Sequence, residues 1–373
     1  IGMKPMVHSP SPKLNWSPYV ALRRFNHLQF DSEGFVSRVC LPECGVEMDL
    51  LDLGCVLGQR LLELDLYFNE GFTGDLAMTT NCPNLERLNL GNCVEVSGNV
   101  SCFDQCYKSL NWLDLHWCKG VHGEIESFRK CVNLVHLNLS GNDQLTGRLE
   151  TLRHLAKLEV LQLTGTLFQG DIQKAFGNSR MPNLRVLSLE GCKDVVGDIG
   201  VVAHLPLLEE LRLSGCSRVH GDVRCFTVGP PVQDADGYYD DGNKHFDRGH
   251  ASALHYFGSG GVERDAVTVG KSLVPVSLKG VMALNDDEEE VGGYGVFDNR
   301  HHGRGPDPRP LSRLTEVGLH DCRGVTGDAA VFASLPLLGK LVLWRTEVQL
   351  GEAYGCSKAA LKKILPPGCL LLM

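Results

Sequence analysis

Apolar residues recur along the chain with a period of 24 to 26 residues. The leucine that marks each period, here called the anchor, is preceded by apolar residues two and five positions earlier. The apolar–x–apolar step that ends at the anchor is the alternation of a β-strand with one buried face. A fixed period of this length predicts a solenoid of stacked units. The anchors are Leu41, Leu66, Leu90, Leu115, Leu139, Leu163, Leu189, Leu213 and, after an interval of 106 residues, Leu319 and Leu343.

The positions that follow each anchor are equally regular. Eight residues after the anchor most repeats have Gly, which indicates a turn geometry closed to other residues. Thirteen residues after it comes Phe or an aliphatic residue, and we expect these to stack as a spine beneath the outer face. Three residues after the anchor stands a small side chain, expected to turn inward and bond unpaired backbone. These side chains, here called the ladder, are Cys44, Asn69, Cys93, Cys118, Asn142, Thr166, Cys192, Cys216, Cys322 and Thr346.

The repeat resembles the leucine-rich repeat, L-x-x-L-x-L-x-x-N/C. Its tail, as in Val196-Gly197-Asp198-Ile199, is similar to the plant-type subclass, and its ladder Cys is similar to the subclass found in F-box substrate adaptors. The chain departs from the plant type because it lacks Pro after the Ile position and uses Cys for Asn. Over about 36–226 and 311–351, the resemblance implies an α/β solenoid. This would be a right-handed superhelix of about ten repeats with a parallel concave β-sheet.

The chain divides into five segments. Residues 1–35 are expected to cap the first repeat and to contain a short helix around Tyr19–His27. Repeats occupy 36–226 and 311–350, and 351–373 form a second cap with a helix over Lys358–Leu365 after the N-cap residue Ser357. Between the repeats lies an acidic, Gly-rich insertion, 227–310, with 14 acidic and 8 basic residues. It could be a disordered loop, an island over the concave face with a strand at Val274–Leu278, or an expansion without a role.

Aromatic and histidine side chains are predicted to gather on the concave face. The outward positions of the concave sheet lie four, three and one residues before the anchor and one and two residues after it. They place one group on strands that together span ~15 Å; its members are Tyr67, Phe68, Trp112, His116, Trp117 and His136. A second group past the insertion comprises His320, Trp344 and Arg345. Exposed Trp and Tyr often dominate binding energy, so we expect both groups to contact a protein partner, unless they are scattered surface residues or covered by the N-terminal segment.

The sequence offers no motif for catalysis, a cofactor or a metal. Gly270-Lys271-Ser272 lacks the Gly that a phosphate-binding loop needs at position 265, which is Asp265. No His or Cys pair has zinc-ligand spacing. A polar residue follows each turn Gly, which we interpret as local backbone bonding, with a calcium-binding or basic-partner stripe as the alternative. The residues in this row are Asp75, Asn99, Glu124, Arg148, Asp171, Asp198, Asp222 and Asp328.

Charge and cysteine usage narrow the class of partner. The net charge of −9 without a basic block argues against nucleic acid and anionic membranes, and no apolar run approaches the length of a membrane span. Six of the 15 Cys occupy ladder positions, and Phe30 stands where a paired-Cys cap of extracellular repeats would place Cys. This favours a reducing, intracellular compartment. The chain begins with Ile, so a missing N-terminal segment would leave an extracellular location open.

These features predict a non-enzymatic interaction scaffold without cofactor or metal. Two alternatives stay open: a substrate adaptor of a ubiquitin ligase, which would need an F-box before the repeats, or a receptor-like ectodomain. An enzyme or enzyme activator acting through the insertion would be a different class, and no residue points to it. The sequence names neither the partner nor the oligomeric state.

Overall fold

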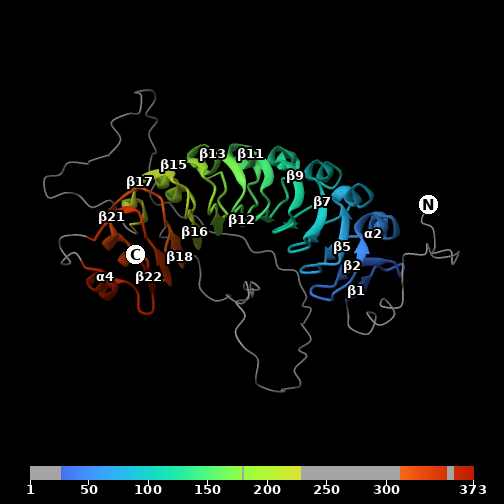
Figure 1. Cartoon of the computed structure of the whole chain (residues 1–373), viewed down its shortest axis with the longest axis horizontal. Coiled ribbons are helices and arrows are strands. Elements are labelled where there is room, and N and C mark those ends of the chain that lie inside the picture. Colours follow the sequence, from blue (N-terminus) through green and yellow to red (C-terminus); the bar gives the residue numbers. More distant parts are fainter. Residues whose placement is uncertain (1–26, 179, 228–310, 351–356) are drawn as a thin grey trace, which may run out of the picture. The chain divides into compact units, whose positions relative to one another are not determined.

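The ten predicted strands lie side by side in a parallel sheet that lines the inner side of the solenoid (Figure 1). We obtained a computed structural model, which describes residues 27–178, 180–227, 311–350 and 357–373. Outside these residues lie the insertion with Val274–Leu278 and the helix expected around Tyr19–His27, apart from His27. The strands are β2 (Val36–Cys40), β4 (Glu63–Asp65), β6 (Arg87–Asn89), β8 (Trp112–Asp114), β10 (His136–Asn138), β12 (Val160–Gln162), β14 (Val186–Ser188), β16 (Glu210–Arg212), β18 (Glu316–Gly318) and β20 (Lys340–Val342).

The register of this concave sheet is uniform. The apolar residue two before each anchor pairs with its equivalent on the next strand, as Leu113 pairs with Leu137. The pairing continues from β16 to β18 without a shift, so the inserted residues leave the register intact. Two strands beyond the predicted ten complete the edges: β1 (Leu28–Phe30) pairs antiparallel with β2, and β22 (Leu370–Leu372) pairs parallel with β20. The leucine-rich-repeat solenoid expected from the sequence is confirmed.

A second parallel sheet of ten strands, which the sequence did not predict, runs beside the first. Eight of its strands contain the recurrent Gly, whereas β3 has Asp49 at the equivalent position. At Gly98 φ is +127°, and a Cβ there would lie 2.5 Å from Oδ1 of Asp75 in the preceding repeat, so both conformation and space require Gly. The strands are β3 (Met48–Asp49), β5 (Phe72–Asp75), β7 (Glu95–Asn99), β9 (Gly120–Glu124), β11 (Gln144–Arg148), β13 (Leu167–Asp171), β15 (Asp194–Asp198), β17 (Arg218–Asp222), β19 (Gly324–Asp328) and β21 (Glu347–Gln349).

Short helices follow the second sheet on the outer side of the solenoid (Figure 1). The helix predicted after Ser357 is present as α4, and Oγ of Ser357 accepts from the backbone N–H of Ala360. No described helix has the length and apolarity to cross a membrane. The helices are α2 (Leu50–Leu57), η2 (Gly58–Arg60), η3 (Leu76–Asn81), η4 (Val100–Gln105), η5 (Ile125–Lys130), η6 (Leu149–His154), α3 (Ile172–Phe176), η7 (Ile199–His204), η8 (Val223–Phe226), η9 (Ala329–Ser334) and α4 (Lys358–Ile364).

The polar row after the turn Gly caps these helices. Oδ1 of Asp75 accepts from the N–H of Ala77, and the other Asp and Asn members of the row make the same bond. Glu124 and Arg148 do not cap; instead the Glu126 carboxylate accepts from the N–H of Arg148 in the next repeat. The interpretation as local backbone bonding is therefore confirmed for the six Asp and Asn members of the row. Among the described residues no group of three or more His, Cys, Asp or Glu side chains could hold a metal ion.

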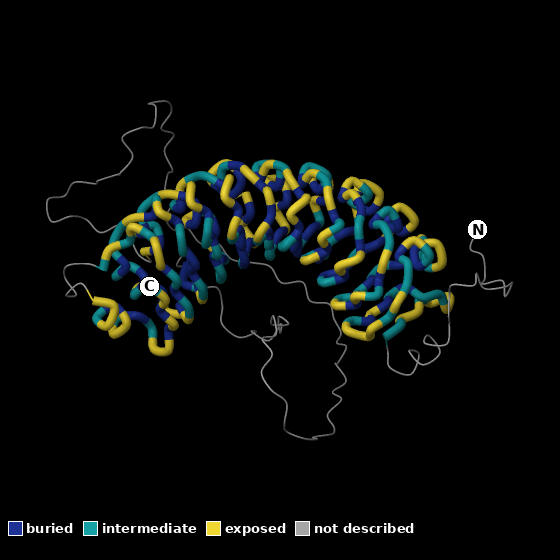
Figure 2. Tube along the Cα trace, in the orientation of Figure 1, coloured by how far each residue is buried: buried dark blue, intermediate teal, exposed yellow. Residues whose placement is uncertain are grey.

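The interior is a continuous apolar core between the two sheets and the helices (Figure 2). Every anchor leucine is buried, and so are the spine phenylalanines. Phe103 and Phe128 in successive repeats have ring centroids 5.7 Å apart, and Phe226 and Phe332, on either side of the insertion, are 5.2 Å apart. The predicted stacked spine is confirmed.

The Asn and most of the Cys side chains of the ladder connect a repeat to the one before it, whereas Thr166 and Thr346 donate to the anchor carbonyls of their own repeats, Leu163 and Leu343. Nδ2 of Asn142 donates to the carbonyls of Leu115 and Leu139, at 2.8 and 2.9 Å. Cys118 Sγ lies 2.9 Å from the carbonyl of Leu90, and the four Cys at the ladder positions of other repeats make the equivalent bond. The prediction for Cys44 is wrong, because its thiol is exposed and bonds the nearby carbonyl of Pro42. Cys44 belongs to the first repeat, so no anchor carbonyl precedes it.

Candidate protein-binding surface

The structure gathers the predicted site residues into two clusters on the concave sheet and the turns that follow its strands. The N-terminal aromatic cluster, carried by the repeats of β4, β8 and β10, comprises Tyr67, Phe68, Trp112, His116, Trp117 and His136. The C-terminal cluster, carried by the repeats of β18 and β20, comprises His320, Trp344 and Arg345.

Trp112 is enclosed between two neighbours rather than open to a partner. Arg87, Trp112 and His136 are in register on three successive strands. The guanidinium carbon of Arg87 lies 4.2 Å from the centroid of the Trp112 ring. The imidazole of His136 stacks on Trp112 with centroids 3.8 Å apart and an interplanar angle of 3°, and only 5% of His136 is exposed. Both residues face the concave side as expected, but they form the floor of the cluster rather than its accessible part.

Tyr67 and His116 meet across an intervening strand because Gly91 has no side chain. Their ring centroids are 5.8 Å apart, although β6 lies between their strands. A Cβ at Gly91 would collide with the His116 ring. Gly91 is therefore a structural part of the cluster that our sequence reasoning did not single out. The sequence did contain a signal for this role. Gly91 comes one residue after its anchor, and the same position holds Tyr67 in the preceding repeat and His116 in the following one.

A buried carboxylate fixes the orientation of His116. Nδ1 of His116 is hydrogen-bonded to Oδ1 of Asp114 at 2.5 Å, and Nδ2 of Asn92 donates to Nε2 of His116 at 3.1 Å. Nδ2 of Asn138 donates to the other oxygen of Asp114. Burial opposes ionisation of Asp114, but hydrogen bonding from His116 and the neighbouring His136 imidazole hold its pKa below the usual range. Asp114 is thus an ionised carboxylate that is hydrogen-bonded to His116 and Asn138.

Phe68 and Trp117 are the exposed members of the cluster, and both have a left-handed backbone. Their φ angles are +54° and +57°, and their exposed fractions are 47% and 46%. In each case the aspartate three residues earlier, Asp65 or Asp114, accepts from the N–H two residues after it and so stabilises the turn. The Trp117 ring lies against Gly141, where a Cβ would be 2.7 Å from Cδ2 of the indole.

The position two residues after the anchor has a positive φ in every repeat, yet its residue type changes along the solenoid. The four central repeats have Gly at this position. These are Gly141, Gly165, Gly191 and Gly215, with φ of +76°, +68°, +76° and +80°. Repeats nearer the ends have larger residues there, Glu43, Phe68, Asn92 and Trp117 before the central four and Asp321 and Arg345 after them.

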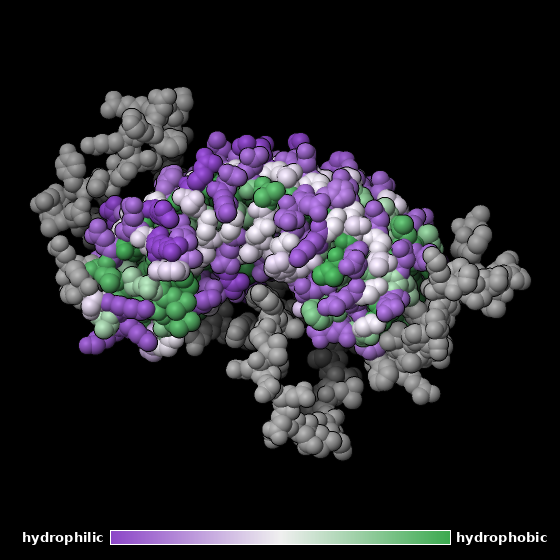
Figure 3. All heavy atoms as spheres, viewed as in Figure 1, coloured by the Kyte–Doolittle hydropathy of each residue, from purple (hydrophilic) through white to green (hydrophobic). Residues whose placement is uncertain are grey.

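The C-terminal cluster is smaller. The rings of His320 and Trp344 stack with centroids 4.8 Å apart and an interplanar angle of 3°. The guanidinium carbon of Arg345 lies 4.5 Å from the Trp344 centroid, and Trp344 is 51% exposed. Figure 3 shows hydrophobic residues gathered at this end of the solenoid, where the edge strand β22 exposes Leu370 and Leu372.

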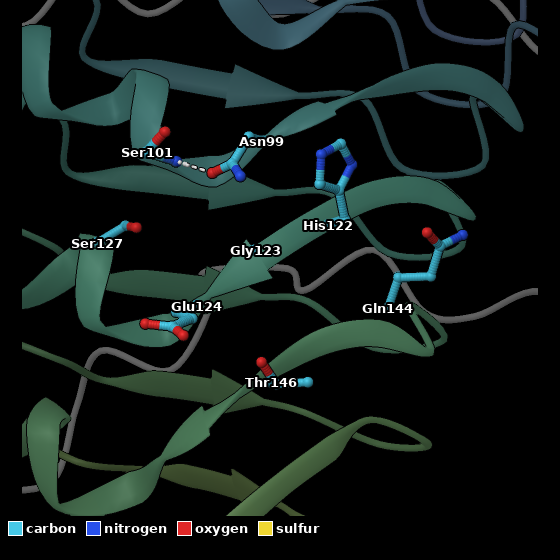
Figure 4. Close-up of a pocket in the computed structure, with 8 residues that line it drawn as sticks. All are labelled: Asn99, Ser101, His122, Gly123, Glu124, Ser127, Gln144 and Thr146. Carbon is cyan, nitrogen blue, oxygen red and sulfur yellow. Dashed lines mark hydrogen bonds between the residues drawn. The ribbon is translucent and has the colours of Figure 1, made fainter.

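An open hollow on the second sheet contains none of the residues predicted to bind a partner on the concave face, and its lining includes Asn99 and Glu124 of the polar row (Figure 4). The one hydrogen bond drawn there is the helix cap from the Ser101 N–H to Oδ1 of Asn99. The His122 ring and the Glu124 carboxylate point away from each other, so the hollow presents no paired acid and base. Its lining residues are Asn99, Ser101, His122, Gly123, Glu124, Ser127, Gln144 and Thr146.

Comparison with known proteins gives a likeness in architecture. No family model and no curated protein matches the sequence. The Arabidopsis receptor kinase HAESA, solved with the peptide hormone IDA and the co-receptor SERK1, is 23% identical over 53% of this chain and 32% of its own, with a TM-score of 0.42. PEPR1–AtPEP1 is 15% identical over 87% of this chain and 37% of its own, with a TM-score of 0.48. Internalin C2 from Listeria monocytogenes is 20% identical over 51% of this chain and 76% of its own, with a TM-score of 0.38. The chain spans about a third of the length of the first two. The fold assignment rests on the register and the ladder described above, because these overall scores are low.

Proposed function

We propose that this chain is a non-enzymatic interaction module that binds a protein partner on its concave face. The N-terminal aromatic cluster is the main contact surface, with Phe68 and Trp117 as the side chains that enter the partner. The observation that supports this proposal most strongly is the left-handed backbone of these two exposed aromatic residues.

A left-handed conformation is unfavourable for residues with a side chain, by about 1–2 kcal/mol. Burial could offset that cost, but about half of each side chain is exposed. The central repeats show that the same turn forms with Gly. Folding therefore gains little from an aromatic residue at either position, and strained residues of this kind concentrate at binding sites. Trp and Tyr are also the residues that most often dominate interface energies.

The residues beneath Phe68 and Trp117 favour binding by keeping the surface rigid. Trp112 is held between Arg87 and His136, and His116 is fixed by Asp114 and Asn92. A surface that is ordered before the partner arrives loses less side-chain entropy on binding. We include the C-terminal cluster as a second contact, in which Trp344 is the exposed side chain.

The proposal is tested with the double variant Phe68→Gly, Trp117→Gly. The unmodified chain is used to capture proteins from its native source, the captured protein is identified by mass spectrometry, and its affinity is then measured with purified components. We expect the double variant to bind at least about tenfold more weakly. Val94→Ala with Val132→Ala removes exposed apolar groups outside both clusters and serves as the control. Equal affinity of the double variant and the unmodified chain would contradict the proposal.

A further inference from the structure

The acidic charge of the described repeats is concentrated on the outward positions of the concave face. Elsewhere the described residues are nearly balanced, with 19 acidic and 18 basic side chains. The outward positions contain 11 acidic and 6 basic residues, a formal difference of −5. The acidic ones are Glu43, Glu63, Asp65, Glu86, Asp114, Glu159, Glu190, Glu209, Glu210, Glu316 and Asp321, and the basic ones are Arg38, Arg87, Arg185, Arg212, Lys340 and Arg345.

The excess of acidic over basic side chains is largest beside the N-terminal aromatic cluster. The two arginines there, Arg38 and Arg87, both pair with Glu63. Arg38 also lies 3.8 Å from the carboxylate of Glu86. Within the described part of the chain, neither Glu43 nor Asp65 forms an ion pair with a basic side chain. Burial and the neighbouring Glu63 carboxylate raise the pKa of Asp65, whereas hydrogen bonds from the Tyr67 backbone and Asn89, and the charge of Arg87, oppose that rise. The ionised form of a partly buried carboxylate is stabilised when a cation is brought next to it.

The unpaired carboxylates lie next to the exposed aromatic rings. Glu43, Phe68, Asn92 and Trp117 occupy the same position of successive repeats. The backbone N–H of Glu43 donates to the Tyr67 carbonyl and that of Phe68 to the Gly91 carbonyl, in the turn of the next repeat. Adjacent strands are ~4.8 Å apart, so Glu43 and Phe68 are direct neighbours in this row. Asp65, the last residue of β4, is three residues before Phe68. The row therefore combines one carboxylate, Glu43, with two aromatic side chains, and Asp65 adds a second carboxylate on the adjoining strand.

From this combination we infer that the partner presents a cationic, extended polypeptide segment to the N-terminal aromatic cluster. Its arginine or lysine side chains lie over the rings of Phe68 and Trp117 and against the carboxylates of Glu43 and Asp65. Aromatic faces attract cations, and the planar guanidinium stacks on them while it pairs with a carboxylate. The inference rests on the proposed function, because it names the chemistry of the partner for the same surface.

The experiment uses fluorescently labelled peptides of alternating Gly and Arg, with a matched Gly–Glu peptide, and measures their binding by anisotropy. The variant Glu43→Gln, Asp65→Asn removes two charges, while Asn at position 65 still accepts from the Tyr67 N–H. Glu70→Gln with Glu95→Gln makes the same change in net charge at exposed sites off the concave face. We expect the Gly–Arg peptide to bind the unmodified chain and the control equally, and the Glu43/Asp65 variant about three- to tenfold more weakly. Binding should also weaken as ionic strength rises.

Three results would overturn the inference: no binding of the Gly–Arg peptide, equal weakening in the control variant, or competition by spermine as strong as that of the peptide. The captured partner separates this inference from the proposed function. If Phe68→Gly, Trp117→Gly loses the partner while Glu43→Gln, Asp65→Asn retains full affinity for it, the inference fails and the proposed function stands. If both variants retain full affinity, both fail.

Discussion

The repeats that contain β4, β6 and β8 and the repeats that contain β12, β14 and β16 share one interior but differ on the concave face. Both regions have buried anchors, ladder bonds and spine residues in the same register. On the concave side the first region has aromatic rings and histidine, whereas the second has small residues such as Thr164, Ser188 and Ser214. The turn after the strand has Phe68 and Trp117 in the first region and Gly165, Gly191 and Gly215 in the second.

The difference separates what folding requires from what it tolerates. The repeats of β12, β14 and β16 show that the solenoid closes with Gly at the left-handed position and no aromatic side chain on the concave sheet. The aromatic residues of the first region therefore add a surface to a scaffold that is complete without them. Substitutions in the interior should therefore lower the stability of both regions alike. Substitutions on the concave face should have different effects on stability in the two regions.

The largest effect is expected for the spine. Phe128→Ala in the first region and Phe176→Ala in the second each remove a fully buried ring. Each should lower the free energy of unfolding by about 3–5 kcal/mol, because the transfer energy is lost and a cavity remains. Denaturant unfolding of both variants measures the change in the free energy of unfolding. A large loss in one region only would show that the two interiors are not equivalent.

A smaller, pH-dependent effect is expected for Asp114→Asn. Because the folded pKa of Asp114 lies below its ordinary value of 3.8, its ionised form stabilises the fold above that pH and this contribution is lost as the pH falls. The variant should be less stable than the unmodified chain by about 1–3 kcal/mol at neutral pH, and the difference should shrink below pH about 4. Gln162→Asn, at the same position of β12, is the control and should show no such pH dependence. A difference that stays constant with pH would exclude the carboxylate charge as its cause.

The smallest effect distinguishes the turns of the two regions directly. Gly165 has φ of +68°, and a Cβ at this position would meet no other atom within 4 Å, so Gly165→Ala introduces backbone strain without a clash. It should destabilise the chain by about 1–2 kcal/mol. Phe68→Gly relieves the same strain but adds flexibility to the unfolded chain, so stability should change by less than about 1 kcal/mol. Thermal unfolding of both variants compares them; a marked loss of stability in Phe68→Gly would mean that the ring serves the fold.

The sequence predicted the interior well because each inward position is repeated ten times. Burial of Leu90 or Phe128 follows from the period alone. The second sheet was missed because its strands contain Gly residues such as Gly98, which are uncommon in strands, and because each pairs only with its counterparts in neighbouring repeats. The prediction that Cys44 turns inward was wrong because the period is the same in every repeat. It does not show that the first repeat has no preceding anchor carbonyl for Cys44 to bond.

The site was predicted only in part, for a physical reason. Strand alternation determines which side chains share the concave face, so the members of the N-terminal aromatic cluster could be selected from the sequence. Whether a ring on that face is accessible depends on its neighbours across the sheet. Arg87 and His136 cover Trp112, and that could not be derived from spacing within one repeat. The left-handed turn at Phe68 did leave a signal, since Gly occupies the equivalent position in the central repeats.

The uninterrupted register between β16 and β18 has a consequence for how the solenoid comes apart. The bond from Cys322 to the Leu213 carbonyl joins residues 109 positions apart, whereas the bond from Cys216 to the Leu189 carbonyl joins residues 27 apart. Closing the longer interval costs about 1 kcal/mol more in chain entropy. This seam should therefore form late in folding and open early in denaturant, detaching the repeats of β18 and β20 from the rest. A partly unfolded population would then exist in which the repeat that carries Trp344 is unfolded, while the repeats that carry Phe68 and Trp117 are still folded.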